Sequence, residues 1–168
     1  MAHVPGRDEV DEIVAAWQRE RPDLDVTPVQ VMSRLDRLAD VFGDRRAAVF
    51  AQHDLRPYEF DVLSALRRCG EPFQLTAGEL TSRTHVTSGT MTSRLDRLSE
   101  RGLVRRAADP GDGRLVRVTL TAAGRRVVDE AFAALLAAER ELLALLDDTA
   151  QRRLAATLRD LLLWTATL

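Results

Sequence analysis

Residues 88 to 106, SGTMTSRLDRLSERGLVRR, have an amphipathic pattern that ends at a glycine and continues into a basic segment. When the residues are placed at 100° intervals, one narrow apolar face holds Thr87, Met91, Leu95 and Leu98. The opposite side is polar and is flanked by Arg97, and Gly102 is a typical helix stop. The pattern predicts a helix over residues 87 to 101 that buries one edge and leaves a polar side open to a partner.

The sequence on either side predicts a second helix and a hairpin. Thr76 and Glu79 have the S/T-x-x-E spacing of a capping box, so a short helix begins there and the polar TSRTH ends it. After Gly102, LVRRAAD and RLVRVTL have the character of two strands, and the PGDG between them favours a turn. Two helices joined by a tight turn and followed by a hairpin, called a wing, form a winged helix-turn-helix.

Helical patterns also precede and follow this centre. The expected outer helices are 7–19, 27–53, 57–69, 122–146 and 150–166. Thr27 and Thr121 are expected to cap two of them, and Pro57 and Gly70 to bound the third helix. The predicted fold class is mainly α with a small β-hairpin, a winged helix-turn-helix with N- and C-terminal dimerisation helices.

One domain is expected over residues 1–168, divided into N-terminal helices (1–55), the winged helix-turn-helix (56–121) and C-terminal helices (122–168). The last helices carry leucine on more than one face, so they need more than one neighbour. Two arrangements satisfy this need. The terminal helices pack against a second copy of the chain, or the tail folds back onto its own core.

Composition and charge restrict the class of protein to which this chain belongs. No run of about 18 apolar residues exists to span a bilayer, and the acidic N-terminus is unlike a signal peptide, so we expect a cytoplasmic protein. The lone Cys69 excludes an intrachain disulfide and a multi-cysteine metal site. The net charge of −2 divides unevenly, with +3 on residues 76 to 117 and −5 on the rest. Basic charge therefore gathers on the helix-turn-helix and the wing, which favours double-stranded DNA as a partner.

Small polar residues near a helix N-terminus let the backbone approach bases and phosphates, while arginine pairs with phosphate or with guanine. A turn-borne arginine fits a narrow minor groove. The predicted DNA-binding residues are Thr87, Ser88, Gly89, Thr90, Thr92, Ser93, Arg97, Arg106 and Arg114.

The stretch GELTSRTHVTSGTMTSRLDRLSERGLVRRAADPGDGRLVRVTLTAAGR resembles the DNA-binding core of the MarR family, through RLxxRGLVxR and the wing DPxDxR. The flanking helices match in number and order. This resemblance implies a homodimeric transcriptional regulator, a repressor, that binds a pseudo-palindromic operator with half-sites about one helical turn apart. One departure is that Gly111 and Gly113 stand where many relatives have a second wing arginine, so wing contacts depend on Arg114.

The extra N-terminal helix with its tryptophan is similar to the urate-responsive PecS/HucR-type branch of that family. The resemblance implies an anion site formed by Trp17, Asp61, Glu79 and Arg94. Arg94 lies about 60° from the centre of the apolar face, so it points toward the protein flank as much as toward DNA. A planar anion would stack on Trp17 while Arg94 supplies charge and forked donors. Urate is the first expected effector, followed by related purines or a carboxylic acid such as trans-aconitate.

Each of these residues also has a structural explanation. In this alternative, the role of Trp17 is to pack the terminal helix, the role of Glu79 is only to cap its helix, and Asp61 is a solvated acid. A winged-helix module that serves only protein contacts is a further alternative.

The alternative regulator is a thiol-based redox sensor that acts through Cys69, helped by Arg67 and Arg68. An enzyme is not expected, because His3, His53 and His85 lie on separate segments and no Gly-rich phosphate loop is present. No catalytic residue, metal or cofactor is predicted beyond the small effector.

Overall fold

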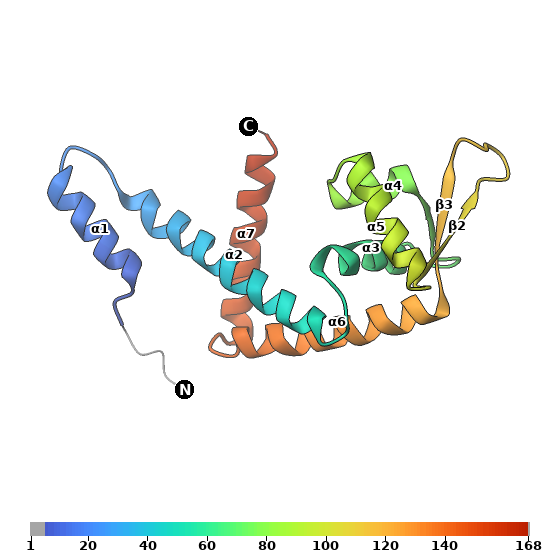
Figure 1. The fold of residues 1–168 in the computed structure, drawn as a ribbon. Coiled ribbons are helices and arrows are strands. Elements are labelled where there is room, and N and C mark those ends of the chain that lie inside the picture. The colour runs from blue at the N-terminus through green and yellow to red at the C-terminus, as the bar shows by residue number, and fades with distance from the viewer. Residues whose placement is uncertain (1–5, 168) are drawn as a thin grey trace. The chain divides into compact units, whose positions relative to one another are not determined.

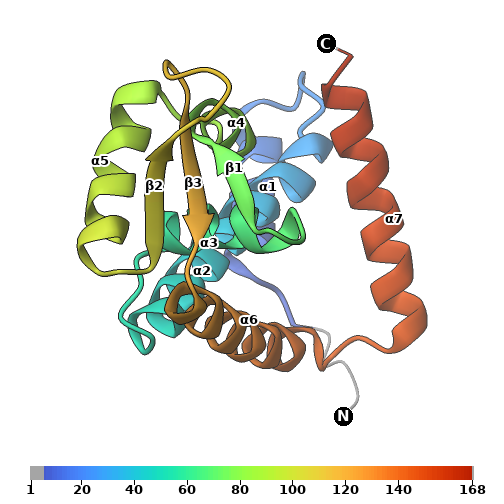
Figure 2. The same ribbon diagram turned by 90° about the vertical axis from the view of Figure 1, so that its right-hand side faces the viewer.

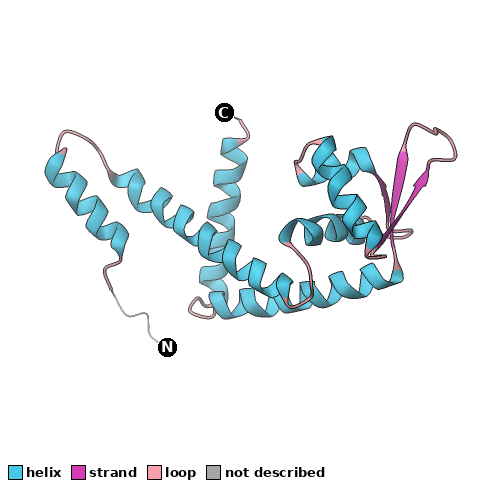
Figure 3. Cartoon of the chain, viewed as in Figure 1, coloured by secondary structure: helices cyan, strands magenta, loops and turns pink. Residues whose placement is uncertain are grey.

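The computed structural model describes residues 6–167 (Figure 1); residues 1–5, with His3, and residue 168 lie outside it. Its elements are α1 (Glu9–Glu20), α2 (Thr27–Ala51), α3 (Pro57–Arg68), β1 (Gln74–Thr76), α4 (Ala77–Thr84), α5 (Ser88–Glu100), β2 (Val104–Ala108), β3 (Val116–Leu120), α6 (Ala122–Leu143) and α7 (Asp148–Thr165). The described chain is thus mainly helical (Figure 3). None of its described helices combines the length and the apolar character that a membrane crossing requires.

The chain divides into two compact units. The central unit is residues 43–136, and the terminal unit joins residues 1–42 to residues 137–168. The central unit holds the end of α2, the helices α3, α4 and α5, the sheet and most of α6. It therefore contains the whole predicted helix-turn-helix and the wing.

The sheet of the central unit is antiparallel, in the order β1-β3-β2 (Figure 2). Leu75 of β1 and Arg106 of β2 both lie opposite Val118 of β3. The predicted hairpin is confirmed, but β1 was missed. Three residues are too few to show the period-2 alternation that identifies a strand, and β1 exists only through its pairing with β3.

One apolar core fills the central unit. Phe50 and Phe60 stack with ring centroids 4.2 Å apart, beside the buried apolar residues of α3. Met91, Leu95 and Leu98 of α5 are buried in the same core. Three of the four residues predicted on the apolar face of α5, the predicted DNA-contacting or recognition helix, are thereby confirmed as buried, and their burial fixes which side of α5 faces out. Thr87, the fourth, is exposed because it precedes α5 as its N-cap.

Local capping sets the bounds of the helix-turn-helix. The Thr76 hydroxyl accepts a hydrogen bond from the Glu79 N–H at 3.2 Å, and the Glu79 carboxylate accepts one from the Thr76 N–H at 2.7 Å. Thr87 caps α5 through the Thr90 N–H at 3.3 Å. Gly102, with φ +67°, follows the end of α5 in the left-handed region that glycine adopts without strain.

The expectation for Thr27 is wrong by one position. Thr27 is the first residue of α2, and its N–H donates to the Asp25 carboxylate at 2.9 Å. Asp25 therefore satisfies the first N–H of α2. An aspartate two residues before a Thr-Pro pair competes with threonine for this role, and the sequence pattern does not rank the two.

Within the terminal unit, α1 is attached to the first half of α2. Val10, Val14 and Val26 are buried together. Beside them Arg34 donates to Asp8 at 2.8 Å and to Asp11 at 2.9 Å. The Arg34 guanidinium lowers the pKa of Asp8 from 3.8 to about 2. A small apolar contact and the ion pairs of Arg34 with two aspartates thus hold α1 against α2.

Large apolar side chains remain exposed on the terminal helices. On α2 they are Val31, Met32, Leu38 and Val41; on α7 they are Leu154, Leu161, Leu162, Leu163 and Trp164. Leu162 is 71% exposed, and α7 buries none of its described side chains. Apolar surface on this scale marks an interaction site more often than a solvated helix.

Candidate functional site

The polar side of α5 is exposed along its whole length. The exposed residues include Thr87, Ser88, Gly89, Thr90, Thr92, Ser93 and Arg97. The chain turns into this helix at His85, which takes a left-handed conformation with φ +53° at the end of α4. Because the opposite edge of α5 is fixed in the core, these seven residues form a preorganised outward surface.

The hydroxyl groups on this surface are oriented by the helix itself. Thr92 donates to the Ser88 carbonyl at 3.1 Å, and Ser93 donates to the Gly89 carbonyl at 3.3 Å. Each oxygen keeps its lone pairs for an outside donor, such as a base amino group. The arrangement suits contact with base edges in a groove.

Hydrogen bonds fix the turn of the wing. The Asp109 carboxylate accepts from the N–H groups of Gly111 at 2.7 Å and Asp112 at 3.1 Å, and it pairs with Arg117. The Arg117 guanidinium, followed by these backbone donors, lowers the pKa of Asp109. The Asp112 side chain accepts from the Arg114 N–H at 3.0 Å. The turn therefore holds the exposed Arg114 at a fixed point of the loop.

Arg106 differs from the other predicted DNA contacts. It lies partly buried on β2 and pairs with Asp96 of α5. This ion pair joins the wing to the recognition helix. A structural role for Arg106 is thus visible, and its contact with DNA stays a prediction.

Two of the predicted effector residues, Asp61 and Arg94, lie near each other in the central unit. Partial burial raises the pKa of Asp61, against the opposing effects of Arg46, Arg94 and Arg68. Arg46 of α2 lies 3.7 Å from Asp61, measured from Nη2 to Oδ1. Asp61 is therefore a half-buried carboxylate that pairs with Arg46 and lies within the electrostatic influence of Arg94 and Arg68.

The guanidinium of Arg94 lies over the ring of Tyr58, with 4.8 Å from Cζ to the ring centroid. Among the described residues it forms no ion pair within 4 Å. An incoming anion would therefore compete with an aromatic ring for Arg94, instead of with the carboxylates of Asp61 or Glu79.

Glu79 and Trp17 are placed differently. The Glu79 carboxylate accepts hydrogen bonds from the Thr76 N–H at 2.7 Å and from the Thr76 hydroxyl at 2.8 Å. These hydrogen bonds lower the pKa of Glu79. Its capping role is observed, and its ligand role stays a prediction. Trp17 belongs to the terminal unit, where its side chain is 52% exposed and available to stack on a planar group.

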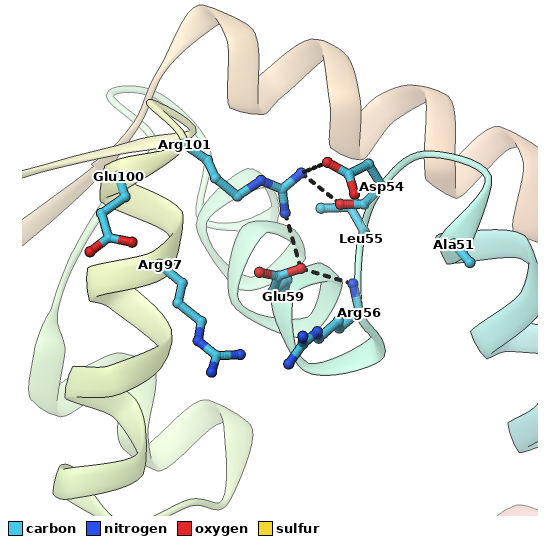
Figure 4. Close-up of a pocket in the computed structure, with 8 residues that line it drawn as sticks. All are labelled: Ala51, Asp54, Leu55, Arg56, Glu59, Arg97, Glu100 and Arg101. Atoms are coloured by element: carbon cyan, nitrogen blue, oxygen red, sulfur yellow. Dashed lines mark hydrogen bonds and ion pairs between the residues drawn. The ribbon is translucent and has the colours of Figure 1, made fainter.

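A pocket of about 460 Å³ lies between the C-terminal part of α5 and the turn that leads into α3 (Figure 4). Arg101 reaches across it to the Asp54 carbonyl at 2.6 Å, to the Asp54 carboxylate at 2.9 Å and to Glu59 at 3.1 Å. Glu59 is only 4% exposed, and it also accepts from the Arg56 N–H at 2.9 Å.

This buried ion pair fastens the end of the recognition helix. Removing Arg101 would leave the Glu59 carboxylate buried without its charged partner, which is costly in proteins. The pocket holds as many arginines as acids, so its charge is balanced. We therefore interpret it as a brace for α5 and not as the effector site.

Cys69 follows α3 directly. Its thiol donates to the Leu66 carbonyl at 3.0 Å, and the side chains of its neighbours contact other groups. Arg67 donates to Asp129 at 2.8 Å, and Arg68 donates to the Ser64 carbonyl at 3.3 Å. This geometry does not favour the redox alternative.

Sequence reasoning missed Tyr58, Glu59 and Arg101. Glu59 and Tyr58 follow Pro57 in the chain, whereas their partners Arg101 and Arg97 lie about forty positions later. The Pro-x-Glu start of α3 signals a helix cap, but nothing local signals a partner so far along the chain.

Known proteins share this architecture. A model described as MarR family matches residues 53–115. The HTH-type transcriptional regulator PecS of Dickeya dadantii is 35% identical over 150 residues, which are 89% of this chain and 90% of PecS.

Solved structures of MarR family proteins have a similar fold. A MarR family protein from Bacillus stearothermophilus has a TM-score of 0.71 and 24% identity, and the match covers 85% of this chain and 99% of that one. BpsR of Bordetella bronchiseptica, whose DNA binding is described as regulated by 6-hydroxynicotinic acid, has a TM-score of 0.61 and 26% identity. That match covers 76% of this chain and 98% of BpsR.

Proposed function

Because the chain belongs to the MarR family of transcriptional regulators, we propose that it binds a pseudo-palindromic operator as a homodimer and represses transcription until a small anion releases it. The observation that carries this proposal is α5 itself. Its apolar edge is buried, while its polar side is exposed along the whole helix. A groove-binding helix needs both properties at once.

The homodimer is supported by the terminal helices. Packing against a second copy of the chain would remove the exposed apolar side chains of α2 and α7 from water, because each copy presents the same apolar surface to the other. Two copies would place two recognition helices on one duplex, which accounts for a palindromic site.

The effector proposal depends on charge and on an available aromatic surface. Arg46 pairs with Asp61, the charges of Arg94 and Arg68 also act on this carboxylate, and Trp17 offers an exposed indole. Urate is a planar aromatic anion, and 6-hydroxynicotinic acid, the compound described for BpsR, is a planar aromatic acid. We propose urate first, with related purines and carboxylic acids as the compounds to test beside it.

Replacing Arg94 or Trp17 with alanine is expected to leave measurable operator binding but to remove release by urate. The first variant lacks the forked cation and the second lacks the stacking surface. Gel shifts with the DNA that flanks the gene, titrated with urate, measure both properties.

Arg125→Ala is the matched control, because Arg125 lies over the ring of Phe73 in the same unit and has no part in the proposed site. This variant should respond to urate as the wild type does. A wild type that stays bound to DNA at millimolar urate would exclude urate as the effector.

A further inference from the structure

Tyr58, at the start of α3, is approached by three arginines. Its hydroxyl accepts from Arg97 Nη1 at 2.8 Å and from Arg56 Nη1 at 3.2 Å. Its ring lies under Arg94, with 4.8 Å from Cζ to the ring centroid, and under Arg56, with 5.9 Å. All four residues belong to the central unit, so these contacts lie within one compact body.

Arg94 and Arg97 have different tasks in the proposed function. Arg94 is turned to the flank of α5 and is the proposed effector ligand, whereas Arg97 lies on the exposed polar side. They contact different parts of one side chain, since Arg94 covers the ring and Arg97 binds the hydroxyl. Tyr58 is therefore a physical connection between the effector residue and a DNA-facing residue.

The chemistry of a phenol suits this connection. Among the described residues, neither Arg94 nor Arg97 forms an ion pair with a carboxylate. A neutral hydroxyl orients the Arg97 guanidinium without cancelling its charge, and the remaining N–H groups stay available for phosphate. A carboxylate in the same place would hold Arg97 but would weaken its attraction to DNA.

We propose that Tyr58 is a positioning residue that transmits the state of Arg94 to Arg97. The inference rests on the proposed function, in which Arg94 binds the effector. A charge-assisted pair between Arg94 and an anion is stronger than its contact with a phenol ring. When Arg94 leaves the ring, Tyr58 loses the nearer of its two guanidinium contacts, the ring is free to shift, and Arg97 loses its fixed hydroxyl partner. This is a contact that differs between the free and the effector-bound state, as a population shift requires.

The test without effector is a double-mutant cycle on operator affinity, measured by fluorescence anisotropy. Arg94→Met removes the guanidinium from the ring while it keeps a side chain of similar length. We expect it to raise the operator Kd about fivefold in the wild-type background and less than about twofold in Tyr58→Phe, a coupling in the range seen for contacting residues. Equal effects in the two backgrounds would overturn the proposal.

The second arm uses urate. Tyr58→Phe keeps the ring under Arg94 and loses only the hydroxyl, so it should still bind urate by calorimetry. The increase in operator Kd that urate causes should fall from about tenfold to within about twofold. A variant that releases DNA as fully as the wild type does would contradict the link. Tyr58 as a mere packing residue would change melting temperature but not this ratio.

Arg56→Gln is the matched control, because it removes the other donor to the same hydroxyl and the more distant guanidinium over the ring, and it leaves the contacts of Tyr58 with Arg94 and Arg97. Its response to urate should equal that of the wild type. A wild type indifferent to urate would remove urate from the proposed function, while the effector-free cycle would still decide the link. The two failures are thereby distinguishable.

Discussion

Ser93→Glu is expected to abolish operator binding, with an affinity loss of at least about 100-fold. Ser93 is exposed on the side of α5 that the core leaves free. A carboxylate there would meet phosphates and the acceptor atoms of base edges, and unfavourable like charges at an interface cost several kcal/mol. The substitution removes no buried contact, so thermal unfolding should remain near that of the wild type. Anisotropy titration of the operator measures the loss.

Gln52→Glu is the control for this prediction, because it adds the same charge at an exposed position beyond the end of α2. It should weaken binding by no more than a few-fold. If Ser93→Glu bound the operator as well as Gln52→Glu, the side of α5 assigned to DNA would be wrong.

The second large effect concerns stability. Gly124→Ala is expected to lower the free energy of unfolding by about 1–3 kcal/mol, because overpacking against backbone is poorly relieved. A Cβ on Gly124 would lie 2.1 Å from the Leu103 carbonyl oxygen and 2.9 Å from Leu120 Cδ1. The start of α6 would have to move away from the base of the wing. Thermal unfolding should show a melting temperature lower by about 2–12 °C.

Gly43→Ala should have the opposite effect. It lies inside α2, and a Cβ there has no atom within 4 Å. Alanine is more favourable than glycine in a helix by roughly 0.5–1 kcal/mol, so this variant should melt slightly above the wild type. A Gly124→Ala protein that melts at or above the wild-type temperature would refute the close packing of α6 on Leu103.

Local signals in the sequence predicted most of the fold. The capping threonines and the glycine at the end of α5 set the helix-turn-helix bounds to within one or two residues, because each acts on its own backbone neighbours. The strand β1 and the role of Asp25 were missed. The strand depends on a partner some forty residues away, and the role of Asp25 depends on a choice between two capping residues that lie two positions apart.

For the candidate site too, the sequence predicted features within one helix but not contacts between helices. The outward side of α5 follows from helical periodicity, and the structure confirms its exposure. The contacts of Tyr58 with Arg94 and Arg97, and of Glu59 with Arg101, arise because α3 packs beside α5. Pattern within a segment cannot identify such pairs, because they depend on tertiary structure.

The most direct test of the central claim is the salt dependence of binding to the DNA that flanks the gene, measured by anisotropy over a range of ionic strengths. If α5 and the arginines of the wing contact the duplex, the logarithm of the affinity should fall linearly with the logarithm of salt concentration, and the slope should correspond to several phosphate contacts. Arg97→Gln and Arg114→Gln should each reduce that slope by about one. A flat salt dependence, or slopes unchanged in both variants, would contradict the assignment of this surface to DNA.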